Sequence, residues 1–318
     1  MNTVCTDIIH MWSHKLESYH GDYESFQKTR EERLKNQQRE YDSQMEHRAH
    51  VQEFVDKFRY NAKRASLVQS RLKHLEKLPE LQAVELEPKI TFRFIDPEEL
   101  SPPILMFDEV SFRYQPNTPL LERVTFGVRL DARIALIGPN GAGKTTLLKL
   151  MMNQLQPQSG LYQRHQKLRT AYFSQHFVDQ LDLSKTPVEI LQEKYPGKTT
   201  EEYRRELGAF GITGQLGVQT AKTLSGGQKS RVVLTLMNMA RPHILVLDEP
   251  TNHLDMDSVD ALAEALTNFK GGVVLVSHDE YLIIKVCKDL LVCEGGSVKA
   301  FPSDFVDYKK RLQAMSMV

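Results

Sequence analysis

The chain has 318 residues, 41% of them hydrophobic, and its 41 basic and 41 acidic side chains cancel to a formal charge of zero. This length suggests about two domains, and the balance of charge argues against a uniformly basic nucleic-acid-binding protein. Three cysteines without paired spacing offer neither a disulfide framework nor a zinc site. No apolar run is long enough to cross a membrane and no signal-peptide pattern is present, so we expect a soluble, cytoplasmic protein without membrane insertion.

The first segment of the chain is repeated near its end. Residues 4–26 align without gaps on residues 286–308, with four identical positions and five more that match by residue type. Self-similarity of this kind indicates two copies of one structural unit. We therefore expect residues 1–27 to fold like the last part of the chain.

Residues 28–79 form a charged segment with helical patterning. They contain no glycine, and no proline before Pro79, and their apolar side chains recur mostly at helical spacing. A second helical run covers residues 61–77, and Pro79 ends it. The pattern predicts a long, charged helical hairpin.

Basic side chains gather near the turn of this hairpin. Residues 57–77 carry seven basic side chains and one acidic side chain, with two aromatic rings among them. Such a cluster is typical either of a surface that binds RNA phosphates and bases or of a solvated helix face. The candidate RNA contacts are Lys57, Arg59, Lys63 and Arg64.

A connecting linker with four prolines, residues 80–103, precedes the main domain. Residues 104–114 then alternate apolar and polar side chains, as a half-buried strand does. Short apolar runs at residues 133–137, 244–247 and 273–276 alternate with helical segments. This alternation predicts an α/β fold with a mainly parallel sheet covered on both faces.

A glycine-rich loop follows the strand at residues 133–137. Residues 138–145 match G-x-x-x-x-G-K-[ST], in which backbone N–H groups surround phosphates, the lysine reaches the terminal phosphates and the hydroxyl reaches Mg²⁺. A helix over residues 145–153 completes the expected context. The candidate ATP-binding residues here are Gly138, Pro139, Asn140, Gly141, Ala142, Gly143, Lys144, Thr145 and Thr146.

Two further sites carry polar groups suited to phosphate chemistry. The strand at residues 244–247 ends at Asp248 and Glu249, where one carboxylate can hold Mg²⁺ and its neighbour can orient or deprotonate water. Ser225 and two glycines precede a helix that we expect to begin near Gln228, so their hydroxyl and N–H groups form an anion site.

The combination of the phosphate loop, the Leu-Ser-Gly-Gly-Gln run (224–228) and the acidic pair resembles the ATP-binding cassette (ABC) family. Two longer sequence motifs, at residues 224–231 and 248–255, resemble those of its F subfamily. Proteins of that subfamily join two cassettes by a charged helical linker. The resemblance implies a P-loop NTPase cassette of the ABC type at residues 104–312, followed by a short tail at residues 313–318.

The resemblance also implies roles for single residues, with ATP and Mg²⁺ as cofactors. Asp248 would hold the metal with Thr145 and Gln175, and Glu249 would be the catalytic base assisted by Gln175 and His278. Tyr114 would stack on adenine. The residues expected to contact the nucleotide held by an opposite cassette, or to couple the two sites, are Ser225, Gly226, Gly227, Gln228 and Asp255.

A second cassette is therefore an expected partner, supplied by a homodimer or by a two-cassette protein. Residues 1–27 would be the tail of a first cassette whose catalytic portion is absent, which puts hydrolysis by this single-cassette form in doubt. F-subfamily proteins act largely on ribosomes, so the resemblance favours a translation-linked ATPase. The alternatives are a truncated, non-catalytic interaction protein and the cassette subunit of a membrane transporter.

Overall fold

The computed structural model describes residues 4–12, 15–58, 60, 65–77, 90–115, 120–174, 179 and 181–316. The chain divides into two compact units, Met1–Pro88 and Lys89–Val318. No described helix combines the length and the apolar composition that a membrane crossing requires.

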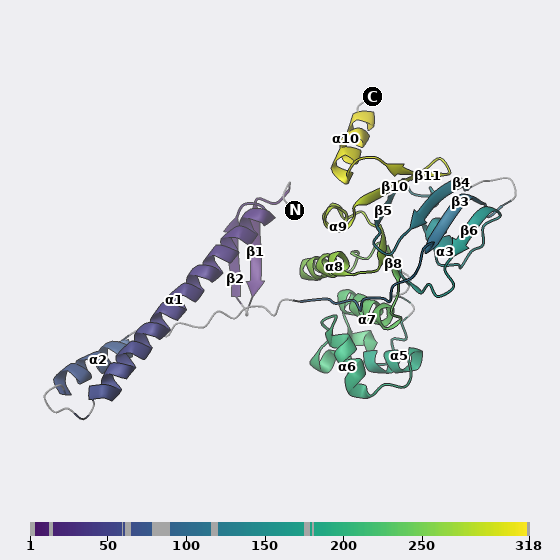
Figure 1. The fold of residues 1–318 in the computed structure, drawn as a ribbon. Helices are drawn as coiled ribbons and strands as arrows, with labels where there is room; N and C mark the ends of the chain where they lie inside the picture. The colour runs from purple at the N-terminus through teal and green to yellow at the C-terminus, as the bar shows by residue number, and fades with distance from the viewer. Residues whose placement is uncertain are drawn as a thin grey trace. The chain divides into compact units, whose positions relative to one another are not determined.

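The first unit consists of a β-hairpin and two helices (Figure 1). Their bounds are β1 Asp7–Trp12, β2 Lys15–His20, α1 Tyr23–Phe58 and α2 Ala65–Lys77. Lacking glycine and proline, α1 runs unbroken for 36 residues. Val51 and Val55 of α1 bury their side chains in one cluster with Val68 of α2. The predicted charged helical hairpin is confirmed, with its first helix beginning at Tyr23 instead of residue 28.

The second unit is built on a six-stranded sheet in the order β11-β10-β5-β9-β8-β7. All pairs are parallel except β10 with β11. The strands are β5 Arg133–Ile137, β7 Thr170–Phe173, β8 Ile244–Asp248, β9 Gly272–Val276, β10 Asp289–Glu294 and β11 Ser297–Phe301. Every residue of β5 and β9 is buried, as both faces of the sheet are covered. The predicted parallel α/β sheet is confirmed.

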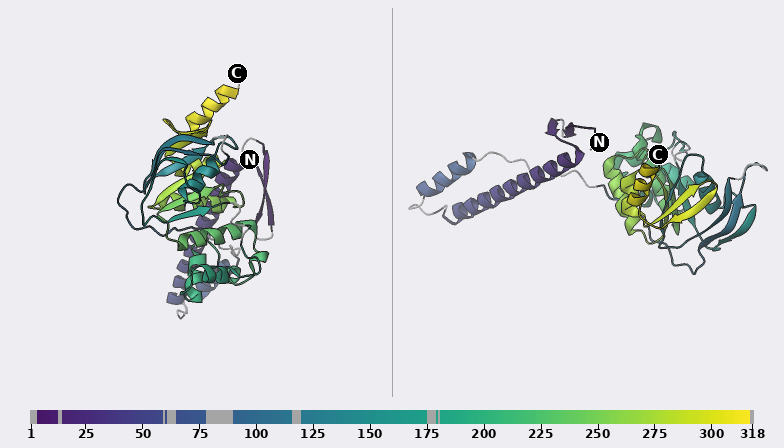
Figure 2. Two further views of the ribbon diagram at one scale, coloured as in Figure 1. Left: turned by 90° about the vertical axis from the view of Figure 1, so that its right-hand side faces the viewer. Right: turned by 90° about the horizontal axis from the view of Figure 1, so that it is seen from above.

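Two layers cover this sheet (Figures 1 and 2). On one face lie α3, Lys144–Met151, and a three-stranded antiparallel sheet that sequence patterning predicted only in its first strand. That sheet has the order β4-β3-β6, with bounds β3 Leu105–Phe112, β4 Leu121–Val128 and β6 Ser159–Arg164. On the other face, the main core gathers α5 Pro187–Lys194, α6 Thr200–Gly208, α7 Gly226–Met239, α8 Met256–Asn268 and α9 Glu280–Val286.

Residues 90–103 belong to the cassette by their packing. They contain no helix or strand, but Phe92 and Phe94 are buried. Both rings contact Phe210, and Phe94 also contacts Phe269 near the end of α8. The C-terminal half of the predicted linker is thus anchored in the apolar core, while residues 80–89 lie outside the described residues.

One hairpin-and-helix unit occurs twice. The N-terminal copy comprises β1, β2 and the start of α1, and the C-terminal copy comprises β10, β11 and α10, Phe305–Ser316. In β1 and β2, Ile8 lies opposite Tyr19; at the aligned positions of β10 and β11, Leu290 lies opposite Phe301. The two hairpins therefore share one pairing register.

The helix also starts in the same way in both copies. The Ser25 N–H donates to Asp22, and the Asp307 N–H donates to Asp304, each at 2.9 Å. An edge-to-face ring pair then holds each helix against its hairpin. The pairs are Tyr19 with Phe26 at 4.9 Å and Phe301 with Tyr308 at 5.4 Å between centroids.

Candidate functional site

The glycine-rich loop between β5 and α3 has a shape that requires glycine. Gly138, Gly141 and Gly143 have φ angles of 151°, 82° and 100°. A Cβ atom at Gly138 would lie 2.1 Å from the backbone oxygen of Cys293, so only glycine fits there. Gly143 is the N-cap of α3 and supplies no side chain, which leaves the first N–H groups of the helix open to an anion.

Lys144 lies across the mouth of this loop. Its Nζ donates to the carbonyl oxygens of Gly138, at 2.7 Å, and Pro139, at 3.0 Å. The ammonium group is therefore held over the space that the loop surrounds. A phosphate bound there would meet this positive charge together with the open N–H groups of α3.

Oxygen ligands for a divalent cation lie beside the lysine. Thr145 Oγ1 is 3.5 Å from Asp248 Oδ2, and the Tyr172 hydroxyl donates to the same Asp248 oxygen at 3.0 Å. A hydroxyl and a carboxylate at this separation match the hard oxygen donors that Mg²⁺ prefers. Burial, followed by the Asp248 charge, raises the pKa of Tyr172, so the phenol remains a donor. Gln175, also expected at the metal, lies outside the described residues.

Glu249 and His278 form a pair at the ends of β8 and β9. The Glu249 backbone N–H donates to Val276 O at 2.8 Å, and Glu249 itself has a φ of 50°. The backbone N–H of His278 donates to Glu249 Oε2 at 3.3 Å, and the ring nitrogen Nε2 of His278 lies 3.6 Å from Glu249 Oε1. Burial raises the pKa of Glu249 and the nearby His278 opposes the rise. A carboxylate with a raised pKa is suited to accept a proton near neutral pH.

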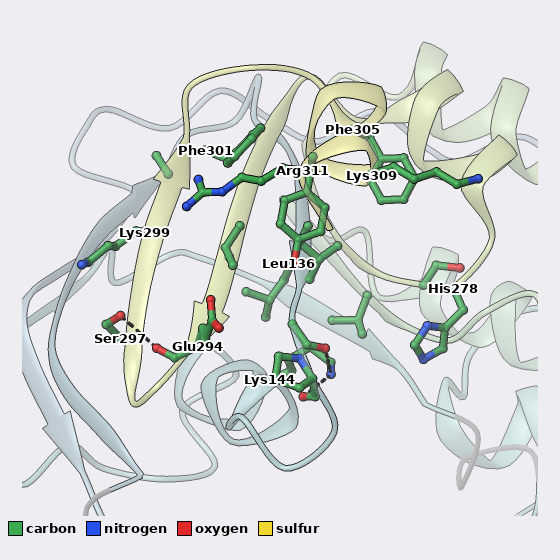
Figure 3. Close-up of a pocket in the computed structure, with 18 of the residues that line it drawn as sticks. Leu136, Lys144, His278, Glu294, Ser297, Lys299, Phe301, Phe305, Lys309 and Arg311 are labelled. Carbon is green, nitrogen blue, oxygen red and sulfur yellow. Dashed lines mark hydrogen bonds between the residues drawn. The ribbon is translucent and has the colours of Figure 1, made fainter. Parts of the chain in front are cut away.

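These groups converge on one cavity of about 390 Å³ over the phosphate loop. The predicted residues that line it are Asn140, Gly141, Gly143, Lys144, Thr145, Thr146, Asp248, Glu249 and His278. A larger cavity of about 1040 Å³ shares Lys144, Glu249 and His278 and extends between the β10–β11 hairpin and α10 (Figure 3). In Figure 3, Lys144 and His278 both lie at the end of this cavity away from Phe301, Phe305 and Arg311.

Tyr114 stands beside the start of α3 with an accessible ring. Its hydroxyl is 3.3 Å from Thr146 Oγ1, and its ring packs edge-to-face on Phe112 at 5.0 Å. The residue is 60% exposed. One face of the ring is thus available to stack on a planar base.

The serine-glycine site lies at the start of α7 and lines neither of these cavities. Ser225 is the N-cap, and a capping box joins its side chain and N–H to Gln228. The helix therefore begins at Gly226, two residues before the predicted start near Gln228, because the serine closes the first turn. Asp255 is likewise absent from both cavities and caps α8 through the Ser258 N–H at 2.8 Å.

The predicted RNA-contacting cluster is described only in part. Lys57 is exposed in the last turn of α1, with its Nζ 5.8 Å from the centroid of Phe58. Arg59, Lys63 and Arg64 lie outside the described residues.

Sequence patterning missed three residues that shape the site. Tyr172 reaches Asp248, Cys293 donates its thiol to Ala142 O at 2.9 Å beneath the phosphate loop, and Arg231 pairs with Asp255. Tyr172 and Cys293 belong to no pattern that marks phosphate chemistry, and Arg231 ends the run at residues 224–231 without a predicted role of its own. Only adjacency in the sheet brings the first two to the site, because β7 pairs with β8 and β10 pairs with β5.

Two family models, each described as an ABC transporter, match residues 9–94 and 121–252. The chain is 52% identical over 314 residues to ATP-binding cassette sub-family F member 3 of Mus musculus and 53% identical over 310 residues to Protein GCN20 of Saccharomyces cerevisiae. These alignments cover 98% and 97% of this chain, but only 44% and 41% of the relatives. The chain therefore spans less than half the length of these curated relatives.

Solved structures with the same fold are ABC cassettes. An ATP-binding subunit of an ABC transporter aligns with a TM-score of 0.56 and 25% identity, covering 66% of this chain and 93% of that one. The dimeric post-hydrolysis state of the cassette MJ0796, bound to ADP and Pi, aligns with a TM-score of 0.53 and 19% identity, covering 62% of this chain and 97% of that one. The second likeness concerns the fold alone. The predicted cassette fold is confirmed.

Proposed function

We propose that this chain, which belongs to the F subfamily of ATP-binding cassette proteins, binds and hydrolyses ATP with Mg²⁺ at a site that a second cassette completes. One observation carries the proposal. Lys144, Thr145, Asp248, Glu249 and His278 line one cavity over the phosphate loop, whereas Ser225 lines neither that cavity nor its larger neighbour. The catalytic groups and the serine-glycine anion site are therefore both present in the chain, but they lie in different parts of it.

The residues of the cavity divide the chemistry with Tyr114, which lies outside both cavities and contacts Thr146 at the start of α3. The loop N–H groups and Lys144 bind the terminal phosphates, and Tyr114 stacks on the base. Thr145 and Asp248 would hold Mg²⁺, which would supply positive charge to the phosphate oxygens. Glu249 accepts a proton from the attacking water, and His278 orients the carboxylate and faces the γ-phosphate.

The second cassette supplies the missing anion site. In a head-to-tail pair, Ser225 and the N–H groups at the start of α7 from one cassette would close on the phosphate held by Lys144 of the other. The N-terminal copy of the hairpin-and-helix unit supports assigning residues 1–27 to the tail of a first cassette. In the C-terminal copy, the same register and the same helix start belong to the last elements of a cassette.

Hydrolysis measured against protein concentration tests the proposal, because a site shared by two chains predicts a specific activity that rises with concentration. Lys144→Ala should lower turnover about 100-fold or more, since it removes the cation facing the phosphates. Glu249→Gln should stop chemistry to a similar extent while ATP stays bound. Normal turnover in both variants would contradict the site assignment.

Mixing two inactive variants distinguishes a shared site from an independent one. Lys144→Ala and Ser225→Arg chains should each be inactive, but a heterodimer places both lesions in one site and leaves the other intact. Partial recovery on mixing is therefore expected. No recovery, with only monomers in sedimentation at saturating ATP, would contradict assembly between copies of this chain.

The basic turn of the linker supports a role on ribosomes or RNA in the cytoplasm. Lys57 is exposed there beside Phe58, and a cation next to a ring suits a phosphate next to a base. Replacing Lys57, Arg59, Lys63 and Arg64 with Gln should weaken co-sedimentation with ribosomes. In a plot of the logarithm of the binding constant against the logarithm of the salt concentration, each lost phosphate contact should reduce the steepness of the slope by about 0.7 to 0.9. An unchanged slope would identify a solvated helix face.

A further inference from the structure

Two loops that line neither cavity are joined to each other within one cassette. The first carries Ser225 and begins α7; the second carries Asp255 and begins α8. A Cβ atom at Gly227 would lie 2.9 Å from the His253 backbone oxygen, so glycine is needed for the start of α7 to approach the second loop this closely. At Gly226, a Cβ would make ordinary contact with the His253 side chain at 3.6 Å.

Arg231 extends this contact by one helical turn. It follows Gly227 by four positions and therefore lies on the same face of α7. One of its guanidinium nitrogens donates both to Asp255 Oδ2, at 2.8 Å, and to Ser258 Oγ, at 2.6 Å. The same helix face thus touches residues 253–258 at two levels.

The energetics of this contact do not favour a purely stabilising role. The Arg231 side chain is only 9% exposed, and its Nε is buried without a hydrogen-bond partner among the described residues. Burying a guanidinium with an unmatched donor is costly, and an apolar replacement of similar size is often neutral for folding. Asp255 is 59% exposed and retains its contact with the Ser258 N–H, so loss of the arginine would leave it solvated and still capping α8.

We propose that Arg231 is a positioning residue that holds the Ser225 loop and the Asp255 loop as one rigid surface for the nucleotide of the opposite cassette. The inference rests on the shared-site function proposed above. Arg231 touches no phosphate itself. Its effect passes through the direction of Asp255 and through the packing of α7 on the backbone at His253.

Arg231→Met tests the proposal, because methionine keeps much of the volume and removes the charge and donors. Turnover should fall about tenfold, the size of a typical coupling between sites, while binding of a fluorescent ATP analogue changes less than about twofold. The urea midpoint should stay within error of the wild type. Arg204→Met removes an exposed arginine ion pair within α6; it is the control for the loss of an arginine and should leave all three measurements unchanged. Unchanged turnover in Arg231→Met, or turnover and urea midpoint falling together, would overturn the positioning role.

A double-mutant cycle and hydrogen exchange complete the test. Adding Asp255→Asn to Arg231→Met should lower turnover little further, because both changes break one contact; additive losses would contradict the joint action. Backbone amides of residues 252–255 should exchange about tenfold faster in Arg231→Met without nucleotide. Equal exchange rates would overturn the rigid surface even if the chain proved inactive, whereas a failed Lys144→Ala test alone would count only against the proposed ATPase.

Discussion

The two copies of the hairpin-and-helix unit share their internal contacts and differ in what covers them. Ile9 and Met11 on β1 are 67% and 76% exposed. At the aligned positions of β10, Leu291 is 8% exposed and Cys293 is fully buried, because both pack in one core cluster with α3 and the three-stranded sheet. The pairing of β10 with β5 brings β10 under this layer. Register, helix capping and ring packing are thus properties of the unit, whereas burial of its apolar face depends on the layer that covers it.

The comparison also shows how the unit serves two purposes. In the C-terminal copy the helix is 12 residues long, and Lys309 of α10 pairs with Glu280 of α9. In the N-terminal copy the helix continues for 36 residues as the linker. The same ring pair therefore fixes the direction of a short closing helix in one copy and of a long arm in the other.

An aspartate placed on the apolar face of each hairpin should produce the largest difference in stability between the two copies. Leu291→Asp buries an unpaired carboxylate in the cassette core and should lower the free energy of unfolding by about 3–5 kcal/mol. Ile9→Asp should change it by no more than about 0.5 kcal/mol, because the residue is exposed. Urea unfolding followed by circular dichroism measures both. Equal losses would mean that the N-terminal face is covered as well.

Removing the ring that joins helix to hairpin should have a smaller effect, and the larger one in the N-terminal copy. Phe26 is only 5% exposed, so Phe26→Ala should cost the first unit about 3 kcal/mol and release α1 from β2. Tyr308 is half-buried, so Tyr308→Ala should cost less. Amide exchange in β2 and β11 reports each loss separately. A larger effect at Tyr308 would reverse the comparison.

The helix caps should show the smallest effect and the greatest similarity. Asp22→Ala and Asp304→Ala should loosen the first turns of α1 and α10 to a comparable degree, because each aspartate accepts one N–H at 2.9 Å. Amide exchange at Ser25 and Asp307 measures the two losses. Faster exchange in only one copy would show that the caps differ in strength.

The cap in the N-terminal copy should also depend on pH. Hydrogen bonds from Ser25 lower the pKa of Asp22, so its contribution to stability is complete above the unfolded-state pKa of about 4 and is lost as pH falls through the lower folded-state value. Protection of the Ser25 amide should therefore decrease only in acid. Asp22→Asn, which keeps the acceptor without titrating, is the control and should abolish this dependence.

Several features of the fold and site were predictable from local patterns. The phosphate loop, the strands ending at Asp248 and near His278, and the helical hairpin each depend on residues close in the chain. Two capping boxes, Thr186 with Glu189 and Thr199 with Glu202, mark the starts of α5 and α6 by equally local contacts, although neither helix was among the predicted elements. These signals are local because helix caps, strand periodicity and phosphate loops are formed by neighbouring residues.

Other features were decided only by the tertiary structure. Phe92 lies in a proline-containing segment that local patterns assign to a linker, yet the main core buries it. Tyr172, Arg231 and Cys293 reach their partners through strand order and helix packing, and no sequence spacing encodes those contacts. The exposure of Ile9 against the burial of Leu291 has the same origin. Similar side chains in the same register differ because burial is a property of what lies beside a strand, and a strand's own sequence does not specify its neighbour.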